Sequence, residues 1–345
     1  MNKIYKLINK IKHYEWGSKE IIPGFLNIQN DKDLRYAEMW MGTHPAAPSQ
    51  TEENGKIVNL SEISGELPFL FKLLAVEKPL SVQVHPDREQ ASYGYNKENE
   101  EGISLDACNR NYKDKNCKNE IICAITPFTL MAGFKNHDDV FLSYKGTYKE
   151  QTDLKNRLAD LYPEDPVVSS ALYLNLVTLE PGQAVFLPAG VPHSYVSGFG
   201  LELMNSSDNV IRGGLTSKHV DIKKLEKIID YEPFKLETIT PDVSKNVFKY
   251  PIQCNDFSLL FVQSRGDKTN VELNAPAICI VTDGELIIED DKYRKGGSFY
   301  ISQAKEKFTL SGNFKLFAAS ANSFSSNPSA EENTQYLGKN FGYSS

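Results

Sequence analysis

The chain has 345 residues, which is more than one ordinary hydrophobic core needs and predicts two or three domains. Charged residues make up 24% of it and hydrophobic residues 40%, as in globular proteins that work in water. The formal net charge of −7 argues against a general nucleic-acid binder, because such proteins carry a basic balance. No window approaches 18 apolar residues, so we expect neither a nucleic-acid partner nor a membrane partner.

The cysteines and the N-terminus indicate a compartment. The five cysteines form no CxxC pair and are odd in number, and they are Cys108, Cys117, Cys123, Cys254 and Cys279. Reduced thiols in a cytoplasmic protein are the simplest interpretation. The first residues, "MNKIYKLINKIKHYEWG", lack the apolar segment of a signal peptide. We therefore expect a cytoplasmic protein.

Short strand-like segments, rich in β-branched and aromatic residues and bounded by Gly and Pro, come first along the chain. Residues 69–86 predict two strands that are broken at the turn 77–79, and further strand signals lie at 120–134, 170–188 and 198–207. Between and after them lie two helical signals. Residues 139–165 carry Leu154, Leu158 and Leu161 at helical spacing, and residues 217–233 carry Ile222, Leu225, Ile228 and Ile229 on one face.

A second group of strand signals follows, at 257–264, 277–289, 296–304 and 308–320. Asp283-Gly284 stands between two apolar runs, which predicts a hairpin turn. Two groups of short strands indicate a mainly β protein with two antiparallel jelly-roll-like units.

The stretch "SVQVHPD" (81–87) places polar side chains on one face of a predicted strand. Side chains alternate along a strand, so Ser81, Gln83 and His85 point one way while the two valines point the other. The valines fit a core. The opposite face, with an amide and an imidazole, needs another explanation.

A second histidine follows in "PGQAVFLPAGVPHSY". The spacing Gly182-x5-Pro188-x-Gly190-x2-His193 is similar to the second half of the motif of cupins, small jelly-roll barrels that hold a metal, although Ser197 replaces its final Asn. Gln83-x-His85 would supply the first half, and Glu120 is the candidate carboxylate. Either piece alone is more often an ordinary polar strand, but together they favour a metal site.

Six stretches together resemble the type I mannose-6-phosphate isomerases (phosphomannose isomerases), zinc enzymes built on cupin barrels. They are "YEWGS" (14–18), "YAEMWMGTHPAAPS" (36–49), "PFLFKLLAVEKPLSVQVHPD" (68–87), "KNEIICAITPFTLMAGF" (118–134), "FLPAGVPHSY" (186–195) and "SSDNVIRGGLTSKHVD" (206–221). Beyond about residue 250 the likeness is architectural, and the chain is short for the family. The family's metal ligands fall on Gln83, His85, Glu120 and His193, which implies one zinc ion per chain; this ligand set would also hold Mn, Fe or Co.

The resemblance implies a fold and a reaction. We expect two cupin-like jelly-roll barrels with a small helical segment: a metal-binding catalytic domain at 1–245 with a helical insert at about 136–166, a second cupin-like domain at 246–325, and a mobile tail at 326–345. The implied enzyme is a monomer or homodimer that interconverts mannose 6-phosphate and fructose 6-phosphate through a zinc-stabilised enediol.

Residues with chemistry carry over from the family by position. Proton transfer or ring opening is expected of Lys118, Tyr195, Glu202, Asp208 or Arg212, and substrate binding of Ser81, Lys72, Lys218 and Arg212. Arg212 and Lys218 flank Gly213-Gly214 and make a local anion site in an acidic chain, although two surface cations in a solvated loop are the plainer interpretation without the family. Glu202, in an apolar run, should be partly desolvated, with a structural ion pair to Arg212 as the alternative role.

One position departs from the family pattern. Where many relatives have His-Lys-Pro-Glu, this chain has Cys117-Lys118-Asn119-Glu120, so a proton-transfer role at Cys117 is in doubt. Trp16, Trp40 and Phe69 are expected in the core. Glu38 and His44 are polar enough to orient another group, and capping and turn roles fit them as well. The alternatives are another metal-dependent cupin enzyme acting on a sugar phosphate, and a non-catalytic sugar-phosphate-binding cupin.

Overall fold

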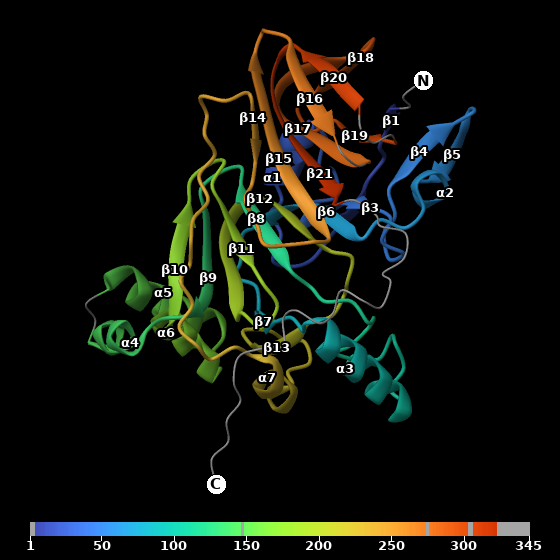
Figure 1. The fold of residues 1–345 in the computed structure, drawn as a ribbon. Helices are drawn as coiled ribbons and strands as arrows, with labels where there is room; N and C mark the ends of the chain where they lie inside the picture. The colour runs from blue at the N-terminus through green and yellow to red at the C-terminus, as the bar shows by residue number, and fades with distance from the viewer. Residues whose placement is uncertain (1–3, 146–147, 274–275, 303–305, 323–345) are drawn as a thin grey trace, which may run out of the picture.

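The computed structural model describes residues 4–145, 148–273, 276–302 and 306–322. These residues form two large antiparallel sheets with helices grouped around the first, so the predicted mainly β fold is confirmed (Figure 1). The division into two barrels at residue 245 stays a prediction. The tail predicted at 326–345 lies outside the described residues.

The first sheet carries most of the family-like segments. Its main path runs β10-β9-β12-β6-β3-β2, and β7, β8, β11 and β13 pair with its members. Its strands are β2 (Lys10–Lys12), β3 (Glu38–Gly42), β6 (Phe69–Val76), β7 (Val82–Val84), β8 (Glu120–Ala124), β9 (Phe128–Phe134), β10 (Leu174–Leu179), β11 (Ala184–Leu187), β12 (His193–Asn205) and β13 (Ile211–Gly214).

The second sheet contains the C-terminal strands and one strand from the N-terminus. Its main path runs β1-β19-β17-β21-β15-β14. Its strands are β1 (Ile4–Lys6), β14 (Val247–Lys249), β15 (Phe257–Arg265), β16 (Thr269–Leu273), β17 (Ala277–Ile288), β18 (Asp291–Arg294), β19 (Ser298–Ile301), β20 (Glu306–Ser311) and β21 (Asn313–Ala321). Because Ile4 pairs with Ile301, the chain enters the second sheet before it builds the first. A separate hairpin contains β4 (Gln50–Glu53) and β5 (Lys56–Asn59).

The largest hydrophobic cluster is shared by the two sheets. Side chains of β3, β6, β8 and β12 pack there against side chains of β15, β17, β19 and β21. Along β6, which is buried on both faces, Phe69, Phe71, Leu73 and Ala75 belong to this cluster. The alternate residues, Lys72 among them, therefore face the other side of the sheet.

The same alternation places polar groups of β8 and β12 on that other side. Ile121 and Cys123 of β8, and Leu201 and Leu203 of β12, belong to the shared cluster. Glu120 and Glu202 consequently point with Lys72 away from the second sheet. Three charged side chains thus gather on one face of one sheet.

Most of the helices lie beside the first sheet, whereas α2 packs against β5 of the separate hairpin (Figure 1). They are α1 (Ile21–Leu26), α2 (Ser61–Ser64), α3 (Arg88–Glu100), α4 (His137–Tyr144), α5 (Lys149–Leu161), the 3-10 helix η1 (Pro166–Ser169), α6 (Ser170–Tyr173) and α7 (Ile222–Ile228). The helical signal at 139–165 is two helices, and Leu161 is exposed although Leu154 and Leu158 are buried. The signal at 217–233 shortens to α7, where Ile222 is exposed and Ile228 is buried.

Two local features differ from the sequence-based expectations. Helix α3 was not predicted, although Asp87 and Gln90 form a capping box at its start. The predicted hairpin at Asp283-Gly284 is wrong, because β17 continues through both residues with a register shift. Gly284 has φ +73°, and a Cβ there would lie 2.0 Å from the Asn313 carbonyl oxygen, so the glycine serves a bulge within a strand.

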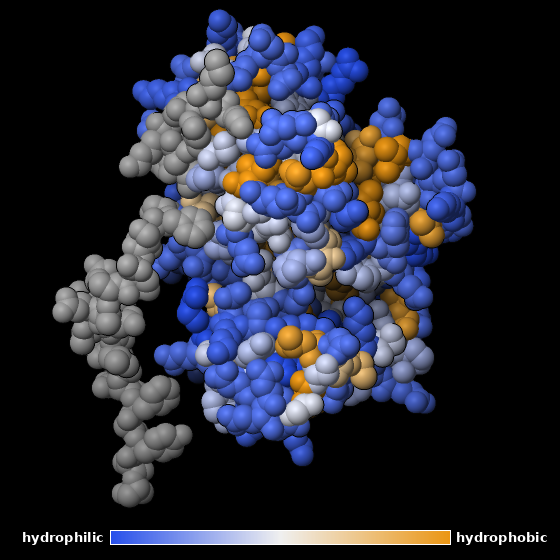
Figure 2. Space-filling view, turned by 90° about the vertical axis from the view of Figure 1, so that its right-hand side faces the viewer, coloured by the Kyte–Doolittle hydropathy of each residue, from blue (hydrophilic) through white to orange (hydrophobic). Residues whose placement is uncertain are grey.

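The face of the molecule shown in Figure 2 is mostly hydrophilic. The face in Figure 2 carries separate hydrophobic patches among hydrophilic side chains. None of the helices in the described part of the chain is long and apolar enough to cross a membrane.

Candidate metal centre and substrate cavity

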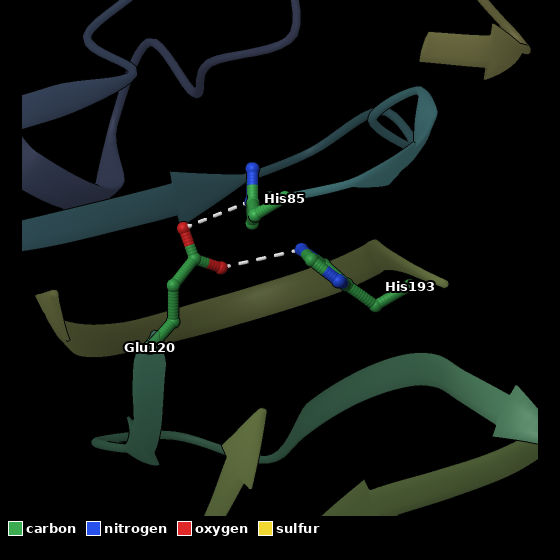
Figure 3. A group of neighbouring side chains, drawn as sticks. All are labelled: His85, Glu120 and His193. Carbon is green, nitrogen blue, oxygen red and sulfur yellow. Dashed lines mark ion pairs between the residues drawn. The ribbon is translucent and has the colours of Figure 1, made fainter. Parts of the chain in front are cut away.

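Three buried side chains meet where β7, β8 and β12 come together. His85 follows β7, Glu120 begins β8, and His193 begins β12. One ligand atom from each lies within 4.8 Å of the others. The two Glu120 carboxylate oxygens point to different histidines, each 3.2 Å from an Nε2 atom (Figure 3).

The hydrogen bonds made by Nδ1 of each histidine fix which ring nitrogen carries a proton. The His85 Nδ1 lies 2.8 Å from the Asn209 carbonyl oxygen, and the His193 Nδ1 lies 2.9 Å from that of Val191. A carbonyl only accepts, so each Nδ1 donates and, in a neutral ring, each Nε2 presents a lone pair to Glu120. Burial, together with the positive charge of Lys118, lowers the pKa of His85 to about 3, which keeps its ring neutral.

Lone pairs on neighbouring imidazole nitrogens and carboxylate oxygens repel one another, so a cation placed between them stabilises this arrangement. Lys118 supplies part of this positive charge, since its Nζ lies 2.8 Å from Glu120 Oε1 and 3.3 Å from His85 Nε2. The Gln83 side-chain nitrogen Nε2 lies 3.3 Å from His193 Nε2, which places this amide beside the cluster, and its oxygen is the candidate fourth ligand. Two imidazoles, a carboxylate and an amide fit a divalent metal.

A second carboxylate lies beside this cluster. The Tyr195 hydroxyl donates to Glu202 Oε1 at 2.9 Å and to Glu120 Oε2 at 3.3 Å, which links the two acids. Burial raises the pKa of Glu202, although the Lys72 ammonium opposes this by stabilising the carboxylate. Burial also raises the pKa of Tyr195 far above its usual value, with help from both carboxylates, so this hydroxyl acts as a hydrogen-bond donor.

Arg212 and Lys218 lie at the two ends of a loop that is held from outside. Leu215, in this loop, has φ +56°, a left-handed conformation that is unfavourable for leucine. Its N–H donates to Asp165 Oδ2 at 2.7 Å, and its buried side chain packs with Leu154 and Leu158 of α5. Burial lowers the pKa of both Arg212 and Lys218, and the positive charge of Arg212 lowers that of Lys218 further.

A cavity of about 830 Å³ joins these groups. Its charged lining residues include Glu120 of the metal cluster, Glu202, Lys72, Lys118, Arg212 and Lys218. Tyr14, Trp16 and Trp40 are among its aromatic lining residues. A cavity of this size with convergent polar groups suits a small polar ligand.

Comparison with known proteins decides the family. Residues 4–137 match the model of the phosphomannose isomerase type I catalytic domain. The mannose-6-phosphate isomerase of Salmonella typhimurium is 32% identical, over 90% of this chain and 98% of that protein, and that of Escherichia coli K12 is 31% identical over the same shares. The chain belongs to the type I mannose-6-phosphate isomerase family. The sequence likeness therefore extends past residue 250, further than the six stretches indicated.

Solved structures of the mannose-6-phosphate isomerase family agree with this assignment. A crystal structure of a zinc-bound mannose 6-phosphate isomerase superposes with a TM-score of 0.82 and 30% identity, over 92% of this chain and 99% of that chain. A variant of the Salmonella typhimurium phosphomannose isomerase gives a TM-score of 0.83 over the same shares. The predicted family is confirmed.

The residues expected from the mannose-6-phosphate isomerase resemblance lie at one site. The cavity is lined by Lys72, Ser81, Gln83, Lys118, Glu120, Tyr195, Glu202, Asp208, Arg212 and Lys218. His85 and His193 lie behind Glu120, with at most 2% of each exposed. The alternative partner suggested for Glu202 is not Arg212 but Lys72, whose Nζ lies 2.9 Å from Glu202 Oε2.

Several lining residues were assigned to other roles from the sequence. Phe69 and Trp40 are in the core as expected, and Trp40 also lines the cavity. The half-buried Trp16 lines the cavity too, as does Glu38, which accepts a hydrogen bond from the Trp40 indole. Glu38 and Trp40 are two apart on β3, the spacing that places both on one face and that could have indicated a shared surface. Trp40 also lies under the Lys72 ammonium, 5.2 Å from its ring centroid.

Cys117, the departure from the family pattern, lies outside the cavity lining. Its Sγ is 3.7 Å from Asn205 Oδ1 and 3.9 Å from Asp256 Oδ2. Burial raises the pKa of its thiol to about 11.

Proposed function

We propose that this chain interconverts mannose 6-phosphate and fructose 6-phosphate. The family membership supports this, and the observation that carries it is the cluster of His85, Glu120 and His193 at a polar cavity of about 830 Å³. A non-catalytic sugar-phosphate-binding cupin would not need both a complete ligand set and buried acid–base groups beside it.

We propose one zinc ion per chain, held by His85, Glu120, His193 and Gln83. The ligand chemistry supports this, because two neutral imidazoles, one carboxylate and an amide oxygen leave a net positive centre. When bound, such an ion supplies Lewis acidity toward the sugar oxygens. The relatives named above include a zinc-bound enzyme, which favours zinc over other divalent ions.

The isomerisation moves a proton from C2 of the aldose to C1 of the ketose through an enediol. Two cavity groups next to the metal cluster, Lys118 and Glu202, are our candidates for this transfer. Glu202 is held by the Tyr195 hydroxyl and by Lys72, and its raised pKa makes it a better proton acceptor than an exposed carboxylate. Tyr195 and Lys72 are then the residues that orient this base.

The remaining cavity groups have roles that follow from charge. Arg212 and Lys218 would bind the phosphate, the former by two parallel hydrogen bonds and the latter as a point charge. Ser81, on the same wall, would donate to a sugar or phosphate oxygen. Asp208, a further carboxylate on the wall, is our candidate for the proton transfer that opens the sugar ring.

We also propose that the enzyme acts in the cytoplasm. All five cysteines are free, which favours a reducing compartment. Its state as a monomer or homodimer stays a prediction.

The test is a coupled assay for fructose 6-phosphate with the purified full chain. Mannose 6-phosphate should be converted, while mannose tests the need for the phosphate and glucose 6-phosphate tests the preference for mannose. Dialysis against a strong chelator should abolish the activity and zinc should restore it. Full activity in metal-free protein, or none with mannose 6-phosphate in zinc-loaded protein, would contradict the proposal.

A further inference from the structure

A pair of asparagines, one buried and one half-buried, lies next to the metal cluster. Asn205, the last residue of β12, accepts a hydrogen bond at Oδ1 from the Asn119 N–H at 2.9 Å and from its Nδ2 at 3.2 Å. The Asn205 N–H donates in return to the Asn119 carbonyl at 3.2 Å. Because Asn119 directly precedes Glu120, these bonds fix the backbone at the point where Glu120 enters the site.

Asn119 also holds the segment that leads to His193. Its Oδ1 accepts a hydrogen bond from the Ala189 N–H at 3.1 Å. Ala189 lies in the turn between β11 and β12, four residues before His193. One amide side chain therefore connects the Glu120 strand with the turn before the second histidine.

Asp256 connects this pair to the second sheet. The Asn205 Nδ2 donates to Asp256 Oδ2 at 2.8 Å, and Asp256 directly precedes β15. The other oxygen, Asp256 Oδ1, lies 3.4 Å from Arg88 Nη2, three residues after His85. Asp256, Asn205 and Asn119 thus contact the chain near all three residues of the metal cluster.

We propose that Asn119, Asn205 and Asp256 form a positioning relay that sets the geometry of the metal ligands, so that the second sheet contributes to metal affinity. This rests on the metal site of the proposed function. Groups that orient ligands from outside typically change metal affinity by about 10–100-fold when they are removed. Asn205 is 4% exposed, so the loss of its partner leaves a buried amide unpaired, and the backbone beside Glu120 shifts to satisfy it.

Two variants test the relay. Asn119→Ala keeps the N–H that bonds Asn205 but loses the side-chain hydrogen bonds with Asn205 and Ala189. Asp256→Ala removes the link to the second sheet at a partly exposed position, where folding is least at risk. Asp267→Ala is the matched control, since Asp267 is an exposed carboxylate in the connection between β15 and β16.

The readouts do not depend on isomerase activity. Zinc affinity is measured by competition with a chromophoric chelator, and ligand geometry by the visible absorption of the Co²⁺-substituted full-length protein. We expect the zinc Kd to rise about tenfold for Asp256→Ala and Asn119→Ala, with an altered Co²⁺ spectrum. Asp267→Ala should match the unmodified protein.

The melting temperature of the metal-free protein distinguishes a role in positioning the metal ligands from a general contribution to stability. If Asp256→Ala and Asn119→Ala lower the melting temperature of the metal-free protein but keep the zinc Kd and the Co²⁺ spectrum, the relay is overturned and only a structural role remains. If the unmodified chain binds no zinc or fails to isomerise mannose 6-phosphate, the proposed function fails instead. The two failures therefore give different results.

Discussion

Lys72 and Glu202 are cross-strand partners on β6 and β12, and their side chains form a buried ion pair with 2.9 Å between Nζ and Oε2. Burial alone would lower the pKa of Lys72, but the carboxylates of Glu202, Glu38 and Glu120 raise it above its ordinary value. The ammonium therefore stays charged inside the protein. The position of the Lys72 side chain therefore depends on its ion pair with Glu202.

The first prediction is that removing one partner of the pair is costly and removing both costs less than the sum. Lys72→Met and Glu202→Gln should each lower the free energy of unfolding by about 3–5 kcal/mol, because each leaves a buried group uncompensated. The double variant should lose less than the two single losses added together, by about 1–3 kcal/mol. Urea unfolding of the metal-free protein measures this cycle, and additive losses would contradict the coupling.

The second prediction concerns Asp165, which holds the loop of Arg212 and Lys218 from outside the cavity. Asp165→Asn weakens a charge-assisted hydrogen bond worth about 1.5–3 kcal/mol and frees the strained Leu215 backbone. The KM for mannose 6-phosphate should rise about tenfold, and kcat should change less than about twofold, because the metal cluster is not touched.

Inhibition by inorganic phosphate provides the check on this loop. Its inhibition constant should rise in parallel with KM, since both would report on the anion site proposed at Arg212 and Lys218. Asp160→Asn, at an exposed position of α5, is the matched control and should leave both constants unchanged. A fall in kcat with an unchanged KM would show that Asp165 acts elsewhere.

The sequence predicted much of this site, and the reason is that alternation along strands is a local property. Gln83 and His85 share a face because they are two apart, and Glu120 and His193 each begin a strand. Tyr195 and Glu202 are different. They are seven apart, which in a regular strand puts them on opposite faces, and they meet because the pairing of β12 shifts register between Tyr195 and Ser197.

Contacts between distant segments could not be predicted in the same way. The bond between Asn205 and Asp256 and the entry of β1 into the second sheet depend on how the two sheets pack. Asp283-Gly284 carried a hairpin signal, but left-handed backbone is needed in a bulge as much as in a turn, and the partner strand decided between them.

The third prediction is that Cys117 takes no part in proton transfer. Its thiol lies outside the cavity lining, and burial raises its pKa to about 11, so it stays protonated in the range where the enzyme would work. Cys117→Ser should leave kcat, KM and the pH profile between about pH 6 and 9 unchanged, since no thiolate is lost. A profile that loses an ionisation in this range would reject this assignment.

The fourth prediction uses His44, which holds Asp208 from behind the cavity wall. Its Nδ1 accepts the Ala46 N–H at 3.3 Å, so Nε2 carries the proton and lies 3.4 Å from Asp208 Oδ2. Burial lowers the pKa of His44 below its ordinary value of 6.5, although the Asp208 carboxylate opposes this. The unfolded chain therefore binds a proton at His44 more readily than the folded protein does.

The sign of the pH effect follows from this difference. The stability tied to neutral His44 is present above about pH 6.5 and is lost as the pH falls below it. His44→Gln should be destabilising at pH 7.5, where it loses the contact with Asp208, and less so at pH 5, where the unmodified protein has lost part of this stability. Urea unfolding of metal-free protein at both values measures it, with exposed His137→Gln as control. An equal loss at both values would mean that His44 takes up its proton equally in the folded and unfolded chain.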